Sequence, residues 1–221
     1  TCWFNGPEGI RASGSALFDG SSQLVIGPLP GLPGAHNLAN VAAALTVVRA
    51  IGADFGVSTD ALESFQALPH RLQTVGEDGG VRFVNDSISS APVATAAALQ
   101  AFSGEVVTLI VGGLDRGVDW SPYMDTFRKD LPLAVIGVPD NGAAIIAALQ
   151  SANIDPPGGL HCAGSLEHAV KRARRITPAG GVVLLSPGAP SFPRFRDYRD
   201  RGMNFARICG FEKEVAALAE S

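Results

Sequence analysis

From residue 71 onward, short apolar runs alternate with stretches of helical character, and this alternation restricts the fold more than any other feature of the sequence. Runs of Val, Leu and Ile bounded by Gly or Pro are typical of strands buried on both faces. Strands separated by helices predict βαβ units. We therefore expect an α/β fold with a doubly wound, mostly parallel, Rossmann-like sheet and helices on both sides. The expected strands are 81–84, 106–111, 133–138, 160–162 and 182–185, and the expected helices lie at about 92–102, 120–130, 141–150, 165–175 and 195–208.

The first part of the chain has a different character. Residues 1–30 contain short β-like segments broken by Gly and Pro, of which "SSQLVIG" is the clearest strand. Helices are predicted within "GAHNLANVAAALTVVRAIGA" and from Asp60 to Phe65. The stretch "LQTVGEDGGVRFV" then predicts a hairpin around Asp78-Gly79-Gly80. We expect two parts, 1–68 and 69–221, and, because Thr1 is not a start methionine, a piece of a longer protein.

The composition excludes several classes of protein. The formal charge of −4 gives no general reason to expect a nucleic-acid partner, and no apolar run reaches the ~20 residues needed for a membrane span. Cys2, Cys162 and Cys209 lack CxxC spacing, which favours a protein of the reducing cytoplasm over a disulfide framework or a zinc site. The sequence has no GxxxxGKS/T phosphate loop, no GxSxG elbow and no HExxH motif, which argues against a Walker-type triphosphate site, an esterase and a zinc peptidase.

Four loops follow the expected strands, at the end of the sheet where ligands of such folds bind. They are "NDSISS" (85–90), "GGLDRG" (112–117), "GVPDNG" (137–142) and "SPGAPS" (186–191). Gly, Asn, Asp and Ser are also the ordinary residues of turns, so any one loop has a purely structural explanation. The first, second and fourth are rich in small and polar residues, and together they predict a site for a polar ligand.

Two further stretches carry candidate ligand-binding residues. "LPGAHNLANVAAAL" places Asn37 and Asn40 at a helix start, where they either cap the helix or read the edge of an adenine. "LPHRLQ" places Arg71 near the junction of the two parts, where it either pairs with acidic neighbours or reaches a phosphate. Each pattern alone is weak evidence.

Arginines crowd the C-terminal region, and 14 of the 17 basic residues of the chain are Arg. We favour a solvated, salt-bridged helix face, and the alternative is a site for a carboxylate or phosphate, which guanidinium groups bind bidentately. The crowd lies beside Asp197 and Asp200 and consists of Arg194, Arg196, Arg199, Arg201 and Arg207.

Taken together, four stretches resemble the Mur ligase family, whose members are ATP-dependent amino-acid-adding enzymes of peptidoglycan synthesis. The resemblance is greatest to the MurD type, the UDP-N-acetylmuramoyl-L-alanine:glutamate ligases. The stretches are "LPGAHNLANVAAAL", "LPHRLQTVGEDGGVRFVNDSISSAPVATAAAL", "VGGLDRGVDWSPY" and "VVLLSPGAPSFPRFRDYRDRGMNFARI". They occur in the family's order and spacing from about residue 30 to 211. The resemblance implies that 1–68 form the end of a central ATP-binding domain and 69–221 a complete C-terminal, glutamate-binding domain.

The resemblance also implies a reaction. Family members use ATP and Mg²⁺ to activate a substrate carboxylate as an acyl phosphate, which the incoming amine then attacks. The phosphate loop and the magnesium-binding residues would lie upstream, so we expect no catalytic residue and no metal ligand here, and we expect this chain alone to be inactive. The partners implied are ATP, glutamate and UDP-N-acetylmuramoyl-L-alanine.

Matching by motif carries the family's ATP-binding positions onto four residues. Asn37 and Asn40 match positions that contact adenine. Arg71 matches an arginine that faces the ATP phosphates, and Asp86 matches an aspartate at the ribose hydroxyls.

The same matching places glutamate among Ser90, Arg116, Ser191 and Tyr198. Arg116 is expected to clamp a carboxylate, while Ser90 and Ser191 donate hydrogen bonds. A dicarboxylate substrate needs a cation and several neutral donors, and this set provides both.

The sequence departs from the D-glutamate-adding pattern at this pocket. That pattern reads Asp-Ser-Lys-Ala-Thr-Asn where this chain has Asp86-Ser87-Ile88-Ser89-Ser90-Ala91, so Ile88 replaces a lysine. Another lysine becomes Arg116, and Tyr198 stands where phenylalanine is usual. Losing one cation and gaining a forked one would re-aim a bound carboxylate, which favours the variant that adds L-glutamate.

Three alternatives remain for the function. The first is a D-glutamate-adding ligase, and the second, from another class, is a non-catalytic module that binds an amino acid or a nucleotide. The third is a polyglutamate-synthetase relative, against which "SPGAPSFPRF" and the following "RG" argue.

Overall fold

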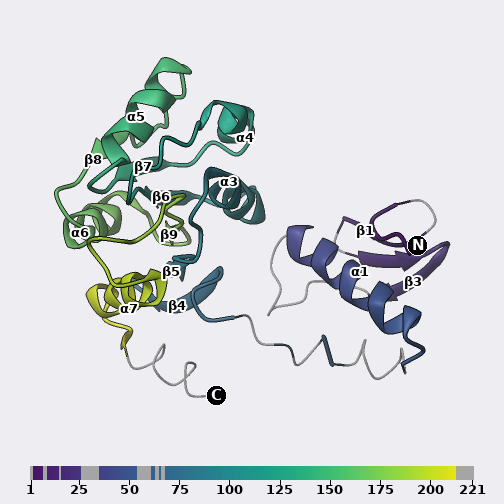
Figure 1. Cartoon of the computed structure of the whole chain (residues 1–221). Coiled ribbons are helices and arrows are strands. Elements are labelled where there is room, and N and C mark those ends of the chain that lie inside the picture. The colour runs from purple at the N-terminus through teal and green to yellow at the C-terminus, as the bar shows by residue number, and fades with distance from the viewer. Residues whose placement is uncertain are drawn as a thin grey trace. The chain divides into compact units, whose positions relative to one another are not determined.

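The computed structural model describes residues 2–6, 9–14, 16–25, 35–53, 61–62, 65 and 68–212, and the chain forms two compact units, 1–67 and 68–221. In the first unit, a three-stranded antiparallel sheet of order β1-β2-β3 lies against one helix (Figure 1). The elements are β1 (Ile10–Ser13), β2 (Ala16–Asp19), β3 (Ser22–Val25) and α1 (Ala35–Ala50). Helix α1 buries Leu38, Val41, Ala42 and Leu45, at helical spacing, against Ile10 and Leu17. Of the short helix expected from Asp60 to Phe65, residues 61–62 are helical, and residues 60, 63 and 64 lie outside the described residues.

The second unit is built on a six-stranded sheet of order β4-β5-β9-β6-β7-β8. Its strands are β4 (Gln73–Asp78), β5 (Val81–Asn85), β6 (Val107–Val111), β7 (Ala134–Gly137), β8 (Leu160–Cys162) and β9 (Val182–Leu185). β4 and β5 form the expected antiparallel hairpin, and every other pairing is parallel. The fully buried strands β6, β7 and β9 are the continuous apolar runs of the sequence. The predicted doubly wound, mostly parallel sheet is thus confirmed.

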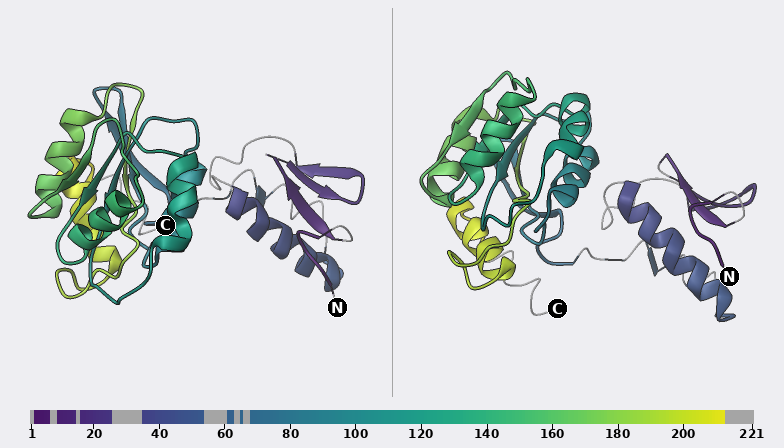
Figure 2. Two further views of the ribbon diagram at one scale, coloured as in Figure 1. Left: turned by 90° about the horizontal axis from the view of Figure 1, so that it is seen from above. Right: turned by 45° about the horizontal axis from the view of Figure 1, so that its top comes forward.

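Helices cover both faces of this sheet (Figure 2). One face packs against α3 (Pro92–Ala101), α4 (Met124–Lys129) and α5 (Gly142–Ser151), and the other against α6 (Leu166–Ile176) and α7 (Tyr198–Cys209). The division follows from the path of the chain, which runs from β5 through β6 and β7 to β8 and then returns to β9. Because parallel crossovers are right-handed, reversing the direction moves the connecting helix to the opposite face.

Two helices differ from the sequence expectation. The helix expected at about 120–130 is divided into a 3₁₀ turn (Ser121–Tyr123) and α4. The helix expected from about 195 begins only at Tyr198, because the extended residue Asp197 caps it by accepting a hydrogen bond from the Asp200 N–H at 2.8 Å.

The strand order places a crevice at the carboxyl ends of β5, β9 and β6. The loops after β5 and β6 lead to α3 and α4 on one face, whereas the loop after β9 leads to α7 on the other. Such a reversal opens a gap between neighbouring loops, and ligands of open α/β sheets bind there. Over the described residues, no helix has both the length and the apolar character needed to cross a bilayer.

Candidate functional site

The four loops predicted to bind a ligand follow β5, β6, β7 and β9, which are neighbours in the sheet. Backbone and side-chain hydrogen bonds join them across the carboxyl edge. The Asn141 side chain accepts from the Gly113 N–H at 3.0 Å, and the Gly112 N–H donates to the Pro187 carbonyl at 2.8 Å. The sequence prediction that these loops meet at one edge is therefore confirmed.

Asp86, at the end of β5, is the polar centre of this edge. It is 3 % exposed, and its Oδ2 accepts hydrogen bonds from the hydroxyls of Ser89 and, at 2.7 Å, Ser186. Its Oδ1 accepts from the Leu72 N–H at 3.2 Å. Burial raises the pKa of Asp86 to about 6, although these three hydrogen bonds oppose the rise. Asp86 thus fastens the loops after β5 and β9 to the segment before β4.

His70 and Asn85 form a second buried contact beside Asp86. The Asn85 Oδ1 accepts from the Ser87 N–H at 3.1 Å, which turns the Asn85 amide nitrogen toward His70 Nδ1, at 2.9 Å. His70 Nδ1 therefore accepts, and its proton lies on Nε2. Burial lowers the pKa of His70, and Arg199 lowers it further. Asp197 opposes both effects, and the net lowering of the pKa favours the ring form in which Nδ1 can accept.

Arg201, on α7, joins three segments from within the core. Its Nε donates to Ser87 Oγ at 2.9 Å, its Nη2 to the Ser87 carbonyl at 2.8 Å, and its Nη1 to the Ala189 carbonyl at 2.9 Å. The guanidinium is 2 % exposed and makes no ion pair with a carboxylate of the described residues. Burial lowers the pKa of Arg201 to about 10, while the charge of Asp86 raises it. Arg201 therefore fixes the positions of the loops after β5 and β9.

A cavity of about 210 Å³ opens between the loops and α6. Its polar lining includes Ser191, Ser165, Arg194 and Arg201, and Leu185 and Phe195 are among the residues of its apolar walls. Ser191 is buried. Asp140 already pairs with Arg194, and Ser87 and Ala189 already accept from Arg201, so the polar side of the cavity consists of hydroxyls and of cations that have partners.

The four residues predicted to bind glutamate have different surroundings. Ser90 and Arg116 are exposed, and neither makes a hydrogen bond or ion pair that holds it to the described part of the chain. Ser191 lines the cavity. Tyr198 is half-buried at the start of α7, with its ring edge-on to His70 at 5.9 Å and its carbonyl accepting from Ser87 Oγ at 2.8 Å. Three of the four are thus on loops, and Tyr198 begins a helix.

The residues predicted to bind ATP lie in both units. Asn37 and Asn40 both lie within α1, where Asn37 is buried and Asn40 is exposed. Since α1 begins at Ala35, Asn37 is the third residue of the helix, and its interpretation as an N-cap is wrong. Arg71 and Asp86 lie in the second unit, where the charge of Arg71 acts on the Asp86 carboxylate and lowers its pKa against the larger effect of burial.

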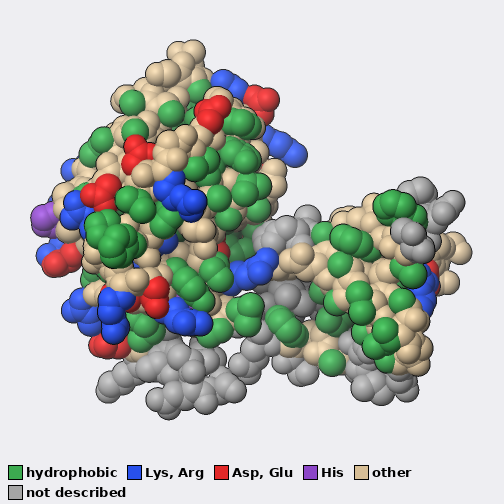
Figure 3. All heavy atoms as spheres, in the orientation of Figure 1, with side chains coloured by type: hydrophobic (Ala, Val, Ile, Leu, Met, Phe, Trp, Pro, Cys, Tyr) green, Lys and Arg blue, Asp and Glu red, His purple; other side chains and the backbone are tan. Residues whose placement is uncertain are grey.

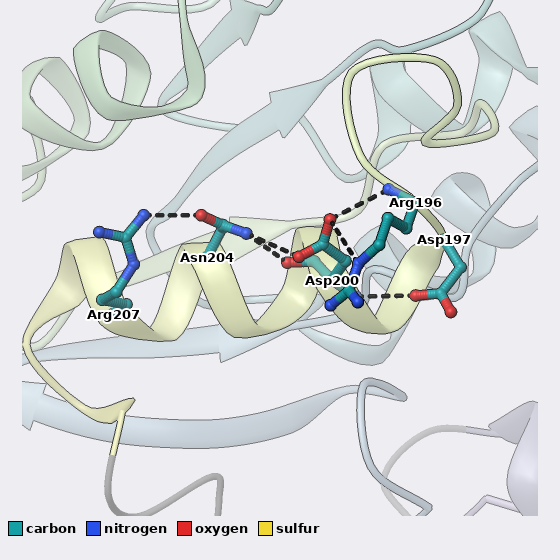
Figure 4. A network of polar contacts seen from close by, with 5 residues as sticks. All are labelled: Arg196, Asp197, Asp200, Asn204 and Arg207. Carbon is teal, nitrogen blue, oxygen red and sulfur yellow. Dashed lines mark hydrogen bonds and ion pairs between the residues drawn. The ribbon is translucent and has the colours of Figure 1, made fainter.

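The C-terminal arginines other than Arg201 are exposed, and two of them, Arg194 and Arg196, form the ion pairs that the sequence favours. Figure 4 shows this network on α7, in which Asp200 accepts from the Arg196 N–H at 3.0 Å and Asn204 links Asp200 to Arg207. Arg194 forms a bidentate pair with Asp140 at 2.9–3.2 Å. Arg201 was predicted to lie on this charged surface, and that prediction is wrong, because α7 directs the Arg201 side chain into the core.

Sequence reasoning gave no role to Ser87 or His70 and placed Arg201 on a charged surface, although each of the three organises the loops. The contact between Arg201 and Ser87 could not be inferred from the sequence, because the two residues are 114 positions apart. One signal was present, because Arg201 is followed by Gly202, and a glycine within a helix indicates close packing.

Among the described residues, no group of three or more His, Cys, Asp or Glu side chains is placed to hold a metal ion. The candidate site instead offers cations and hydroxyls, which bind anions. No step of chemistry in this chain is therefore assigned to Mg²⁺.

Comparisons with known proteins agree with this geometry. The family model "Mur ligase, glutamate ligase domain" matches residues 70–188. The UDP-N-acetylmuramoyl-L-alanine--L-glutamate ligase of Xanthomonas oryzae pv. oryzae (strain MAFF 311018) is 42% identical over 211 residues, which cover 95% of this chain and 45% of the relative. The ligase of the same name from Xylella fastidiosa (strain Temecula1 / ATCC 700964) is 42% identical over 218 residues, covering 96% and 46%.

Solved structures share the fold at low sequence identity. The MurF ligase from Thermotoga maritima in complex with ADP has a TM-score of 0.64 at 19% identity, covering 91% of this chain and 43% of that one. MurC from the same organism has a TM-score of 0.63 at 17% identity, covering 89% and 43%. The chain spans less than half the length of these relatives. With the family model matched over more than half of its length, the chain belongs to the Mur ligase family.

Proposed function

We propose that this chain is the C-terminal part of an ATP-dependent ligase that joins L-glutamate to UDP-N-acetylmuramoyl-L-alanine in peptidoglycan synthesis. The observation that carries the proposal is the 42% identity, over 95% of the chain, to a relative named for this activity. The exposed Arg116 and Ser90, together with Ser191 in the lining of the cavity, provide a cation and two hydroxyls, which supports binding of a dicarboxylate. Because the chain covers 45% of that relative, the complete activity is assigned to a longer protein.

In the proposed reaction, ATP converts the carboxylate of the muramoyl substrate to an acyl phosphate. The amine of glutamate then attacks the carbonyl carbon, the C–O bond to phosphate breaks, and phosphate leaves. This chain supplies the amino-acid site. The exposed Arg116 guanidinium holds one carboxylate of glutamate in a bidentate pair. Ser90 and Ser191 donate hydrogen bonds, and Tyr198 forms one wall.

The proposed contacts to ATP are those that the family resemblance implies. Asn37 and Asn40 bind the adenine edge, and Arg71 binds the phosphates. Asp86 accepts from a ribose hydroxyl through Oδ1, which accepts one hydrogen bond from the described residues, whereas Oδ2 accepts two. A carboxylate oxygen has two lone pairs, so Oδ1 retains one for the nucleotide.

The choice of enantiomer tests the proposal. The complete ligase is assayed for ADP release with UDP-N-acetylmuramoyl-L-alanine and either L- or D-glutamate. We expect kcat/KM to be at least about tenfold higher with L-glutamate, a difference of about 1.4 kcal/mol in the barrier. Equal or better turnover with D-glutamate would overturn the L-specificity, and no turnover with either would overturn the ligase.

Replacing Arg116 tests the amino-acid site. We expect Arg116→Ala to raise the KM for glutamate about 10- to 100-fold, as for loss of a charge-assisted contact of about 1.5–3 kcal/mol, while the KM for ATP changes little. Lys129→Ala, which removes an exposed cation from α4 on the same unit, is the matched control and should change neither constant. Unchanged glutamate kinetics in Arg116→Ala would remove Arg116 from this role.

A further inference from the structure

An open groove of about 670 Å³ follows α6, the helix that crosses from β8 to β9. Its lining includes none of the residues assigned above to ATP or glutamate. Figure 3 shows Lys and Arg side chains on the surface of the second unit, with acidic and hydrophobic side chains between them. We call the open groove the α6 groove, and it is lined by Cys162, Ala163, Gly164, His168, Lys171, Arg172, Arg174 and Arg175.

The spacing of the basic residues directs them to one side of α6. His168, Lys171, Arg172 and Arg175 recur at i, i+3, i+4 and i+7, which is one face of a helix. The opposite face is buried and consists of Leu166, Ala169, Val170 and Ala173. Four of the chain's 17 basic residues therefore lie between positions 171 and 175 of a protein whose formal charge is −4.

The cations of the groove differ in how far they are already paired. Arg174 is neutralised by Asp78, donates to the Cys209 carbonyl at 2.7 Å, and lies over the Phe83 ring at 4.5 Å. Lys171 pairs with Glu167 at 2.8 Å, but both side chains are exposed, and such a pair contributes little. Arg175 is exposed and has no hydrogen bond or ion pair to the part of the chain described here.

Arg172 is oriented without being neutralised. His161 Nε2 lies 2.8 Å from the Gly158 carbonyl, to which it donates, so its Nδ1 is the acceptor for Arg172 Nη1 at 3.0 Å. The imidazole holds the guanidinium in place as a neutral acceptor. Arg172 therefore keeps its full positive charge and further N–H donors for a ligand.

The groove begins at a second point where consecutive connecting helices lie on opposite faces of the sheet. α5 follows β7 on one face and α6 follows β8 on the other, as at the first site. Cys162 is the last residue of β8, and Ala163 and Gly164 follow it directly. Gly164 also lines the 210 Å³ cavity, so the two spaces share a wall.

From these contacts we propose that the α6 groove is a second anion site, which binds a compact oligophosphate through Lys171, Arg172 and Arg175. At 1.5 Å per residue, His168 and Arg175 are about 10 Å apart along α6, a span that suits a chain of two or three phosphates. The cations occupy two helical turns of a concave surface, which is too short for the extended phosphate track of a nucleic acid. A nucleoside triphosphate and inorganic tripolyphosphate share this chemistry.

Cys162 provides a direct readout of occupancy. Cys162 and Cys2 are exposed, Cys209 is buried, and Cys2 lies in the other unit. The purified chain is treated with iodoacetamide at low ionic strength, with and without tripolyphosphate, and alkylation of each cysteine is followed by peptide mass spectrometry. We expect tripolyphosphate to slow alkylation of Cys162 by about fivefold or more, because a bound anion shields the thiol and disfavours its thiolate, while Cys2 is unchanged.

Variants connect the protection to the named cations. In Lys171→Gln/Arg175→Gln, the tripolyphosphate concentration for half-protection should rise about tenfold or more, with each protein normalised to its own rate without ligand. The matched control Lys129→Gln removes an exposed cation from α4, on the other face of the sheet, and should behave as the wild type. No protection of Cys162, or equal protection in the double variant and the wild type, would overturn the proposal.

Further ligands distinguish the sources of phosphate. Protection by ATP and by tripolyphosphate at similar concentrations supports recognition of the phosphate chain. Protection by ATP alone would overturn it in favour of a nucleoside site. Stronger protection by phosphatidylglycerol vesicles or by a single-stranded oligonucleotide would overturn it in favour of those partners.

Discussion

Asp86 binds a proton more readily in the folded chain than in water, because burial raises its pKa from 3.8 to about 6. Between these two values the folded state holds a proton that the unfolded chain has released. The stability contributed by this group is therefore complete below about pH 4 and is lost as the pH rises through about 6. The difference of roughly two pKa units corresponds to about 3 kcal/mol.

We expect Asp86→Asn to remove this pH dependence. Urea unfolding is followed from about pH 4 to pH 7 by the fluorescence of Trp120, which is buried in the second unit. The free energy of unfolding of the wild type should fall over this range relative to that of Asp86→Asn. Asp119→Asn, which changes a fully exposed carboxyl, is the control and should keep the wild-type slope. Equal slopes in Asp86→Asn and the wild type would show that Asp86 does not titrate as described.

At the scale of single residues, the sequence predicted position better than environment. Asp86 could be placed at a strand end and in a ligand-binding loop from its neighbours alone. Its burial could not, because that depends on Ser186, 100 residues away. The same holds for Arg201, whose sequence neighbours are charged and whose helix turns it inward to Ser87.

Gly202 lies in the middle of α7, a position where alanine would ordinarily stabilise a helix more than glycine does. Gly202 faces the end of β5, and a Cβ built on it would overlap His70 Nδ1 and lie 2.8 Å from Asn85 Nδ2. In an unconstrained helix, Gly→Ala stabilises by about 0.5–1 kcal/mol. Here we expect Gly202→Ala to destabilise by about 1–3 kcal/mol, as overpacking of a filled core does.

Thermal unfolding of Gly202→Ala, compared with the wild type, measures this effect. Arg207→Ala on the exposed side of α7 is the control, with an expected change within about 0.5 kcal/mol. The double variant His70→Ala/Gly202→Ala should be destabilised by less than the sum of the two single variants, because His70→Ala removes the atom that the new methyl group meets. A stabilised Gly202→Ala would mean that α7 does not pack as closely as described.

At the scale of elements, the sequence predicted strands most accurately. The predicted bounds of β8 and β9 match the structure, and for β9 the reason is a continuous apolar run that follows Gly181 and ends before Ser186 and Pro187. Helix starts were less certain, since they depend on capping bonds. Helix α7 begins at Tyr198 and not at about 195, because the Asp197 carboxylate caps it by accepting from the Asp200 N–H. This capping residue could not be identified in a segment that contains several acidic and basic residues.

At the scale of the whole chain, βαβ alternation predicted the sheet, and the family resemblance predicted the site. The alternation could not give the strand order, in which β9 inserts between β5 and β6. Because the chain returns from β8 to this inner position, the connecting helices change from one face of the sheet to the other at two places. The candidate site and the α6 groove lie at these two places. Strand order is decided by long-range packing, which local periodicity does not encode.

The two units also have separate cores, which leads to a prediction about cooperativity. Leu45 is buried in the core of the first unit and Leu184 in that of the second, and no described residue belongs to both cores. Replacing either leucine by alanine should destabilise its own core by about 2–5 kcal/mol.

In a Trp3→Phe background Trp120 is the remaining tryptophan, so its fluorescence reports the second unit alone. We expect Leu184→Ala to lower the urea midpoint of the Trp120 transition and Leu45→Ala to leave it unchanged, while far-ultraviolet circular dichroism shows an earlier transition in Leu45→Ala. A shift of the Trp120 midpoint in Leu45→Ala as large as that in Leu184→Ala would instead establish that the two units unfold as one cooperative body.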